Sequence, residues 1–175
     1  MPKIIENLRE QLLTEAKKQI AERGYADMTI RSVAKAVGVG VGTVYNYFES
    51  KEMLVASFVF ESWKKYLERM AALPTDDART LLFGVYLALT EFADENSKLF
   101  SDASAAGIQM ASFSTRHRLL REQIAGFVRP ISDCRFEAEF IAESLIAHSS
   151  DRVDFDELYK VFEKIIKNNL HKGDT

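Results

Sequence analysis

The 175-residue sequence has little of what breaks helices or cross-links chains, with three prolines, eight glycines and one cysteine. The lone Cys134 can form neither an internal disulfide bond nor a multi-cysteine metal site, so a reducing compartment is the simplest setting. No apolar run is long enough to span a bilayer, and the N-terminal segment MPKIIENLRE is too charged for a signal peptide. The sequence therefore predicts a soluble, cytoplasmic protein without membrane contact.

The residues that are abundant favour an all-α fold. Hydrophobic residues make up 47% of the chain and aromatic residues 11%, which is typical of a folded globular protein. Apolar residues recur at intervals of three and four along most of the chain, and no segment alternates convincingly as a strand does. We expect about nine helices.

Residues 29–48, TIRSVAKAVGVGVGTVYNYF, predict two short helices that meet at a glycine-rich turn. Thr29 is a good N-cap, because its hydroxyl can accept a hydrogen bond from a backbone N–H of the first turn. Gly38 can end the first helix in the left-handed conformation without steric cost. In the second helix Val44 and Phe48 lie four residues apart and share one face. This is the layout of a helix-turn-helix that reads DNA.

The same stretch resembles the N-terminal signature of the TetR family of transcriptional regulators. The matching residues are Thr29, Val33, Ala34, Gly38, Val39, Gly42, Thr43, Val44, Tyr45, Tyr47, Phe48, Ser50, Lys51, Glu52 and Leu54. The resemblance covers the first third of the chain. Two positions depart from the pattern, since Gly40 stands where the family often has Ser or Thr and Val41 where it often has a basic or polar residue. Both departures remove side-chain donors from the start of the second helix.

The resemblance implies two domains, which we place at residues 1–50 and 51–175. The first is expected to be a three-helix, helix-turn-helix DNA-binding domain whose first helix ends at Gly24. The second is expected to be a larger helical bundle for ligand sensing and dimerisation. Ser50 can cap its first long helix, which ends before Pro74.

The residues expected to contact double-stranded DNA are Thr29, Gly40, Val41, Gly42, Thr43, Tyr45, Asn46, Tyr47 and Lys51. Thr43 and the two tyrosines can donate to phosphate oxygens, Asn46 can pair with an adenine edge, and Val41 can touch a thymine methyl group. The glycines allow backbone amides to approach phosphates, as at a helix N-terminus. Lys51 resembles the family's phosphate contact. The alternatives are hydrophobic packing for the tyrosines and an ordinary solvated side chain for Lys51.

Charge is distributed unevenly, although the total of −3 at first argues against a nucleic-acid partner. Residues 1–51 carry eight basic and six acidic groups, a net charge of +2, which leaves −5 for the remainder. Counterion release depends on the groups that contact phosphates, so a modestly basic module on an acidic body can still bind DNA. The low positive charge predicts weak non-specific binding.

The last two predicted helices, residues 136–148 and 154–170, carry broad apolar stripes. The stripes comprise Ala138, Ile141, Ala142, Leu145, Ile146, Phe155, Leu158, Val161, Phe162, Ile165, Ile166 and Leu170. One interpretation is packing within the same chain. The resemblance implies instead a homodimer whose four-helix bundle is built from these helices, with two recognition helices about 34–36 Å apart on a palindromic DNA site.

By the same resemblance the second domain would hold a pocket for a small apolar or aromatic ligand. The candidate lining residues are Trp63, Tyr66, Met70, Phe83, Tyr86, Phe100, Met110, Phe113, His117 and Phe127, for each of which ordinary core packing is the competing interpretation. A ligand would act by favouring a dimer whose fourth helices have moved the recognition helices out of register. The domain is short for such a pocket, so the ligand could be small or absent.

Other functional classes fit poorly. Gly38, Gly40 and Gly42 superficially resemble a dinucleotide-binding loop, but a helix precedes them and the spacing is wrong. His117, His148 and His171 lie on separate segments without acidic partners at metal spacing. We expect no enzyme, metal or cofactor. The sequence therefore predicts a ligand-responsive, dimeric repressor, and the alternative is a helical dimer that binds DNA constitutively or scaffolds a partner without a sensor.

Overall fold

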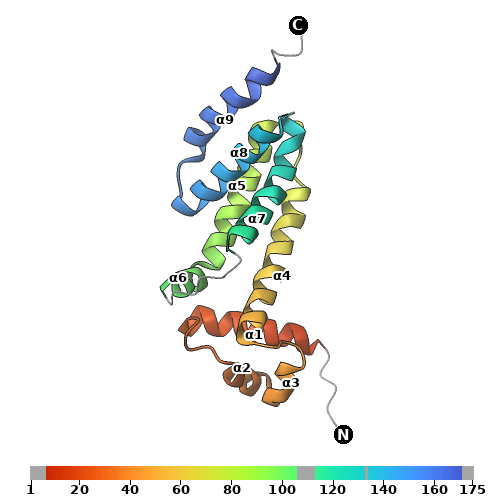
Figure 1. Ribbon diagram of the computed structural model, residues 1–175, viewed down its shortest axis with the longest axis vertical. Helices are drawn as coiled ribbons and strands as arrows, with labels where there is room; N and C mark the ends of the chain where they lie inside the picture. The colour runs from red at the N-terminus through yellow and green to blue at the C-terminus, as the bar shows by residue number, and fades with distance from the viewer. Residues whose placement is uncertain (1–6, 106–112, 133, 171–175) are drawn as a thin grey trace. The chain divides into compact units, whose positions relative to one another are not determined.

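The computed structural model describes residues 7–105, 113–132 and 134–170, and all regular secondary structure in these ranges is helical (Figure 1). Nine α-helices and one 3-10 helix, η1, lie in these ranges, which confirms the all-α prediction. In chain order they are α1 (Leu8–Arg23), α2 (Ile30–Val37), α3 (Val41–Tyr45), α4 (Lys51–Ala71), α5 (Ala78–Glu95), α6 (Ser97–Ala105), α7 (Phe113–Val128), η1 (Arg129–Ile131), α8 (Arg135–Asp151) and α9 (Phe155–Leu170).

The helices form two compact units whose residues are not contiguous in the chain. The first unit contains the described residues up to Lys64 together with those from Glu95 to the end of α6. The second contains the rest. The boundary between the two packed units therefore falls within α4 and again at the end of α5. The division into a DNA-binding and a sensing domain after residue 50 stays a prediction.

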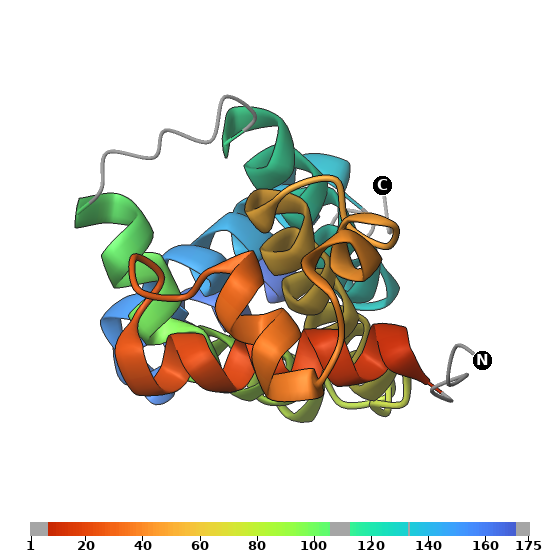
Figure 2. The ribbon, with the colours of Figure 1, turned by 90° about the horizontal axis from the view of Figure 1, so that it is seen from below.

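The first unit is built around the three N-terminal helices, with α1 packed against α2 and α2 against α3 (Figures 1 and 2). Its buried core comprises Leu8, Leu12, Leu13, Ala16, Ile20, Met28, Ile30, Val33, Ala34, Val44, Phe48, Leu54, Val55, Phe58 and Leu99. The core draws on every helix of the unit. The two short helices are thereby anchored by burial of their apolar faces rather than by their own length.

Helix α6 belongs to this first unit, although residues 51–175 were expected to form a separate domain. Leu99 lies in the N-terminal core. The backbone N–H of Tyr25 donates to Asp102 Oδ2 at 2.8 Å, and Lys98 Nζ donates to the carbonyl of Ala21 at 3.1 Å. These bonds satisfy backbone groups at the end of α1, which stops as expected at Gly24 (φ 92°).

The second unit contains α5, α7, α8 and α9, with α7 packed along α8. Its buried residues include Leu81, Leu82, Val85 and Leu89 on the inward face of α5. The Phe155 ring of α9 packs against Phe83 and Tyr86 of α5, with ring centroids 5.1 and 5.6 Å apart. The Tyr86 hydroxyl donates to the carbonyl of Val153 at 2.7 Å, which fixes the turn before α9.

Most of the stripe residues on α8 and α9 are covered by their own chain. Those buried in this way are Ala138, Ile141, Ala142, Leu145, Phe155, Leu158 and Phe162. The large exposed apolar side chains of the two helices are Phe136 (75% exposed), Phe140 (45%) and Val161 (50%). Of these three, only Val161 was among the predicted stripe residues. Periodicity locates an apolar face, but it does not say whether the same chain or another one covers it.

None of the helices in the described ranges is both long and apolar enough to cross a membrane.

Candidate nucleic-acid interface

The start of α2 is closed by a reciprocal pair of hydrogen bonds. Thr29 has extended backbone angles (φ −131°, ψ 153°), and its hydroxyl accepts from the Ser32 N–H at 3.0 Å. Ser32 Oγ accepts in turn from the Thr29 N–H at 3.1 Å. This capping box confirms the predicted N-cap and holds an exposed hydroxyl at the N-terminal end of α2.

The turn between α2 and α3 has the left-handed glycine that was predicted at Gly38. Gly38 is left-handed (φ 80°, ψ 31°), and its N–H donates to the carbonyl of Ala34 at 3.0 Å. Gly40, in contrast, has ordinary extended angles (φ −70°, ψ 148°). A Cβ atom on Gly40 would meet only Thr43 Oγ1, at 3.7 Å, and one on Gly42 would meet nothing within 4 Å. The fold therefore requires glycine at position 38 but at neither of the other two.

Helix α3 turns polar and aromatic groups outward from a buried anchor. Val44 is fully buried and Phe48 is 3% exposed, which confirms the shared face predicted for them. Tyr45 is 51% exposed, Tyr47 is 48% exposed, and Asn46 is exposed as well. The helix ends at Tyr45, earlier than expected, although the N–H groups of Tyr47 and Phe48 still donate to the carbonyl of Val44 at 3.0 Å.

Thr43 and Val41 lie closer to the body of the unit than the residues that follow them. Both are half-buried, and Val41 packs against the N-terminal core. This contact gives Val41 a structural role, which the family departure at this position did not suggest.

Lys51 is bound to the α1–α2 turn. Its Nζ donates to the carbonyl of Tyr25 at 2.6 Å and to that of Ala26 at 3.5 Å, and it lies 4.1 Å from the centroid of the Tyr25 ring. Burial lowers the pKa of the Lys51 ammonium. The Tyr25 hydroxyl donates to Glu52 Oε1 at 3.2 Å. Lys51 is therefore neither an ordinary solvated lysine nor an uncommitted cation, and it ties the start of α4 to the turn before α2.

Two basic side chains on α2 were not among the predicted contacts. Arg31 and Lys35 are exposed, and no ion pair joins either of them to an acidic group in the part of the chain that the structure describes. The charge count of residues 1–51 included both, but a count does not say which charges share a surface with Thr29.

The expected ligand-binding residues are divided between the units. Trp63 and Phe100 belong to the first unit, with Trp63 buried and Phe100 41% exposed. In the second unit Tyr66, Met70 and Tyr86 are buried, Phe83 is 46% exposed, and His117 and Phe127 are half-buried. Met110 and the side chain of Phe113 lie outside the described residues. The ring contacts of Tyr66 with Phe92 (5.6 Å) and of Tyr86 with Phe155 are those of core residues.

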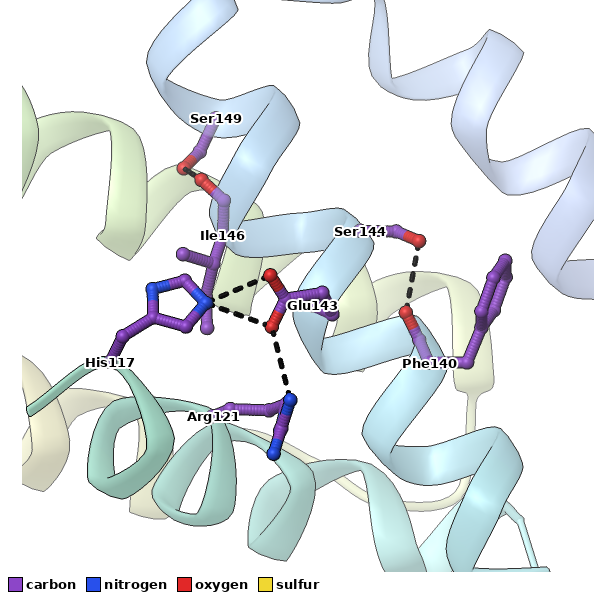
Figure 3. Close-up of polar contacts among 7 residues, drawn as sticks. All are labelled: His117, Arg121, Phe140, Glu143, Ser144, Ile146 and Ser149. Carbon is purple, nitrogen blue, oxygen red and sulfur yellow. Dashed lines mark hydrogen bonds and ion pairs between the residues drawn. The ribbon is translucent and has the colours of Figure 1, made fainter. Parts of the chain in front are cut away.

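His117 takes part in a polar cluster between α7 and α8 (Figure 3). Its Nε2 lies 2.8 and 3.0 Å from the two carboxylate oxygens of Glu143, and Arg121 Nη1 lies 3.8 Å from Glu143 Oε2. The sequence did not predict this pairing, because His117 and Glu143 are 26 residues apart and leave no local pattern.

Three comparisons with known proteins bear on this surface. A family model described as bacterial regulatory proteins, tetR family, matches residues 12–58. The fatty acid metabolism regulator protein of Bacillus subtilis is 38% identical over 60 residues, which are 34% of this chain and 31% of that protein. The HTH-type transcriptional repressor Rv1474c of Mycobacterium tuberculosis is 25% identical over 195 aligned residues, covering 99% of this chain and all of that protein.

Among solved structures, a transcriptional regulator from Rhodococcus sp. RHA1 superposes with a TM-score of 0.64 at 18% identity. The superposition covers 96% of this chain and 98% of the other. At this identity the likeness concerns the fold alone.

Proposed function

Because the chain belongs to the TetR family of bacterial transcriptional regulators, we propose that it is a dimeric repressor of transcription that binds a palindromic DNA site through α2 and α3. Family members are regulators and not enzymes, which confirms the expectation that this chain has no catalytic role. A regulator that binds bacterial DNA would act in the cytoplasm, and we assign the chain to that compartment.

The observation that carries the proposal is that α3 and the three residues after it have a buried and an exposed side. Val44 and Phe48 fix the segment in the core, while Tyr45, Asn46 and Tyr47 are exposed. Exposed aromatic hydroxyls and an amide on a rigidly held helix suit contacts in the major groove. Base selection is assigned to Asn46 and Tyr45, with Thr43 at the edge of the contact.

Phosphate contacts are assigned to Thr29, Tyr47 and the basic side chain of Arg31, which adjoins the α2 cap. Gly40 and Gly42 support this arrangement. The fold has room for a side chain at both positions, so packing within the chain does not explain why both residues are glycine. A nucleic-acid backbone that approaches closely does explain it. Lys51 contributes by holding the turn that precedes α2. In this proposal its positive charge also lies near the DNA backbone.

The dimer is assigned to the outward face of α8 and α9. Phe136, Phe140 and Val161 are large apolar side chains that their own chain leaves exposed, and such a group is stabilised when a second copy covers it. A two-fold dimer binds two half-sites about one helical turn apart, which is why the DNA site should be palindromic.

A small apolar or aromatic effector is assigned to the second unit, near the half-buried Phe127 and the His117–Glu143 pair. The aromatic residues supply apolar surface, and the pair supplies a polar group that could orient a ligand. Effector binding would shift the dimer toward a state in which the two recognition helices no longer match one groove period.

The test is selection of bound sequences from random DNA with the purified chain. An inverted repeat is expected, with binding lost for Asn46→Ala and Tyr45→Ala and retained for Phe60→Ala, a control at another exposed aromatic residue of the same unit. Selection of no palindromic sequence would sink the repressor proposal. Palindrome binding that no small molecule affects would instead favour the constitutive alternative.

A further inference from the structure

Gln19 of α1 is a polar side chain buried in an apolar core. It is 1% exposed and lies on the same helix face as Ala16 and Ile20. A buried amide lowers stability unless its hydrogen bonds are made, and an apolar side chain of similar volume would fill the same space. The amide must therefore be explained by what it binds.

Both polar atoms of the Gln19 amide form hydrogen bonds. Nε2 donates to Glu15 Oε1 at 2.8 Å on the same helix, and Oε1 accepts from the hydroxyl of Ser32 at 2.5 Å. Ser32 is the residue that closes the α2 capping box. The interior of α1 is thus connected directly to the cap of the helix that begins at the DNA-facing surface.

Gln19 anchors the Ser32 side chain that closes the cap. A serine hydroxyl has one proton and two lone pairs, and Ser32 Oγ has two acceptors within reach, Gln19 Oε1 at 2.5 Å and the Thr29 carbonyl at 2.8 Å. A hydrogen bond donated to Gln19 ties Ser32 Oγ to the buried face of α1, while a lone pair of the same oxygen accepts from the Thr29 N–H. The Thr29 hydroxyl oxygen meanwhile accepts from the Ser32 N–H.

This arrangement leaves the hydroxyl proton of Thr29 uncommitted. Thr29 is exposed, and its oxygen is fixed as an acceptor by Ser32, so its proton can only be donated away from the cap. A phosphate oxygen of the DNA backbone is an acceptor of the right kind for a hydroxyl at a helix N-terminus.

We propose that Gln19 is a positioning residue for DNA binding, which acts through Ser32 to hold the Thr29 hydroxyl in the orientation that donates to a DNA phosphate. The proposal rests on the proposed function, because it needs α2 to lie against DNA. Gln19 is too deeply buried to touch DNA itself, so an effect on affinity must be indirect, either through the cap or through the packing of α1.

The test is a double-mutant cycle on affinity for the selected DNA site, with Gln19→Met, Thr29→Val and the double variant. Gln19→Met keeps the side-chain volume and removes the amide. We expect each single variant to weaken binding by about threefold to tenfold, as for one hydrogen bond, and the double variant to bind like Thr29→Val alone. Since a phosphate contact carries no sequence information, affinity for random DNA should fall by the same factor.

A purely structural role for Gln19 would give a different pattern. A loosened core would weaken binding again in the Thr29→Val background, and that additive result, or unchanged affinity in Gln19→Met, would overturn the proposal. Gln11→Met, an exposed glutamine on the same helix, is the matched control and should bind as the wild type. If Gln19→Met does not fold, Ser32→Ala breaks the same connection from the surface and must show the same non-additivity.

A second readout does not depend on DNA. In the free protein the backbone amide of Thr29 should exchange with solvent faster in Gln19→Met than in Gln11→Met, because the Ser32 hydroxyl that accepts from it is no longer anchored to α1. If Thr29 exchanges faster in Gln19→Met but the wild-type chain binds no palindromic DNA, the proposed function is refuted. The hydrogen-bonded connection from Gln19 through Ser32 to Thr29 is then still supported. Unchanged exchange would refute the inference alone.

Discussion

At the scale of single residues, the glycines of the first unit are present for different reasons. Gly24 is needed by the fold, because its φ is +92° and a Cβ atom there would lie 2.5 Å from Asp102 Oδ2. Gly42 meets nothing within 4 Å and lies inside α3. The fold therefore explains glycine at position 24, whereas at position 42 we propose that close approach of DNA explains it.

Substituting these two glycines should separate folding from DNA binding. Gly24→Ala is expected to lower the free energy of unfolding by about 1–3 kcal/mol, because the backbone conformation and the close carboxylate both oppose a side chain. Gly42→Ala should leave stability unchanged or raise it by about 0.5–1 kcal/mol, as alanine favours helix, yet weaken DNA binding. Urea unfolding and DNA titration measure the two effects. A Gly42→Ala protein that binds DNA as the wild type would contradict the close approach assigned to this turn.

The carboxylate of Glu52 gives the first unit a pH dependence. Hydrogen bonds from its own backbone N–H and from Ser50, with a further one from Tyr25, lower the pKa of Glu52 below its usual value. Because the folded pKa lies below the unfolded one, the stabilisation is present above the unfolded pKa and is lost as the pH falls through the folded value.

The free energies of unfolding of the wild type and of Glu52→Gln are expected to become more alike in acid. Wild type should be more stable than Glu52→Gln at pH 7, and the difference in unfolding free energy should shrink as the pH falls from about 5 to about 3. Unfolding in urea at several pH values measures it. A difference that stays constant over this range would show that the charge of Glu52 is not what stabilises the turn.

Single residues also mark the limit of what could be predicted. Thr29, Gly38 and Ser50 were identified because a cap depends on residue type within one turn of helix, and the Met53 N–H does donate to Ser50 Oγ at 3.2 Å. The partner of Lys51 is 26 residues away and that of Gln19 is 13 residues away. Neither distance leaves a local pattern, so both contacts required the folded structure.

At the scale of whole elements, α6 is the main departure from expectation. The apolar pattern of the sequence is weak in this segment, and the partners of α6 are residues of α1 and the α1–α2 turn, 77 positions earlier in the chain. A contact at that separation follows from topology and has no signature in the local sequence. The helix that was assigned to the sensing domain is thus part of the unit on which we propose the DNA-binding surface.

The attachment of α6 can be tested at Asp102. Asp102→Ala leaves the Tyr25 N–H without its acceptor and should lower the free energy of unfolding by about 1–3 kcal/mol, with faster amide exchange in the turn after Gly24. Asp102→Asn keeps an oxygen acceptor and should lose less. Equal losses in the two variants would mean that the acceptor oxygen is not the important feature.

Helices α8 and α9 carry the dimer prediction. Phe136→Ser and Phe140→Ser together should weaken self-association at least tenfold without unfolding the chain, because both side chains are exposed within it. Phe60→Ser, at 58% exposure in the first unit, is the matched control. Sedimentation equilibrium measures the change. Unaltered association of the double variant would assign the interface to another surface.

At the scale of the whole molecule, composition and charge agree with the family but did not identify it. The net charge of +2 in residues 1–51 is small, so the proposed DNA binding requires a few well-placed groups and is strengthened if two copies bind together. The signature in residues 29–54 was specific because many residue types recur in one register. The second unit has no such signature, which is why its effector is proposed from residue chemistry alone.

The central claim is that two copies of this chain read a palindromic site through two copies of α3, and a spacing series tests it most directly. Binding of the purified chain is measured on its selected site and on versions with about 5 base pairs inserted between the half-sites, which turns them to opposite faces of the duplex. The account predicts two chains per duplex on the selected site and loss of that binding on insertion. Equal affinity for both spacings would contradict it.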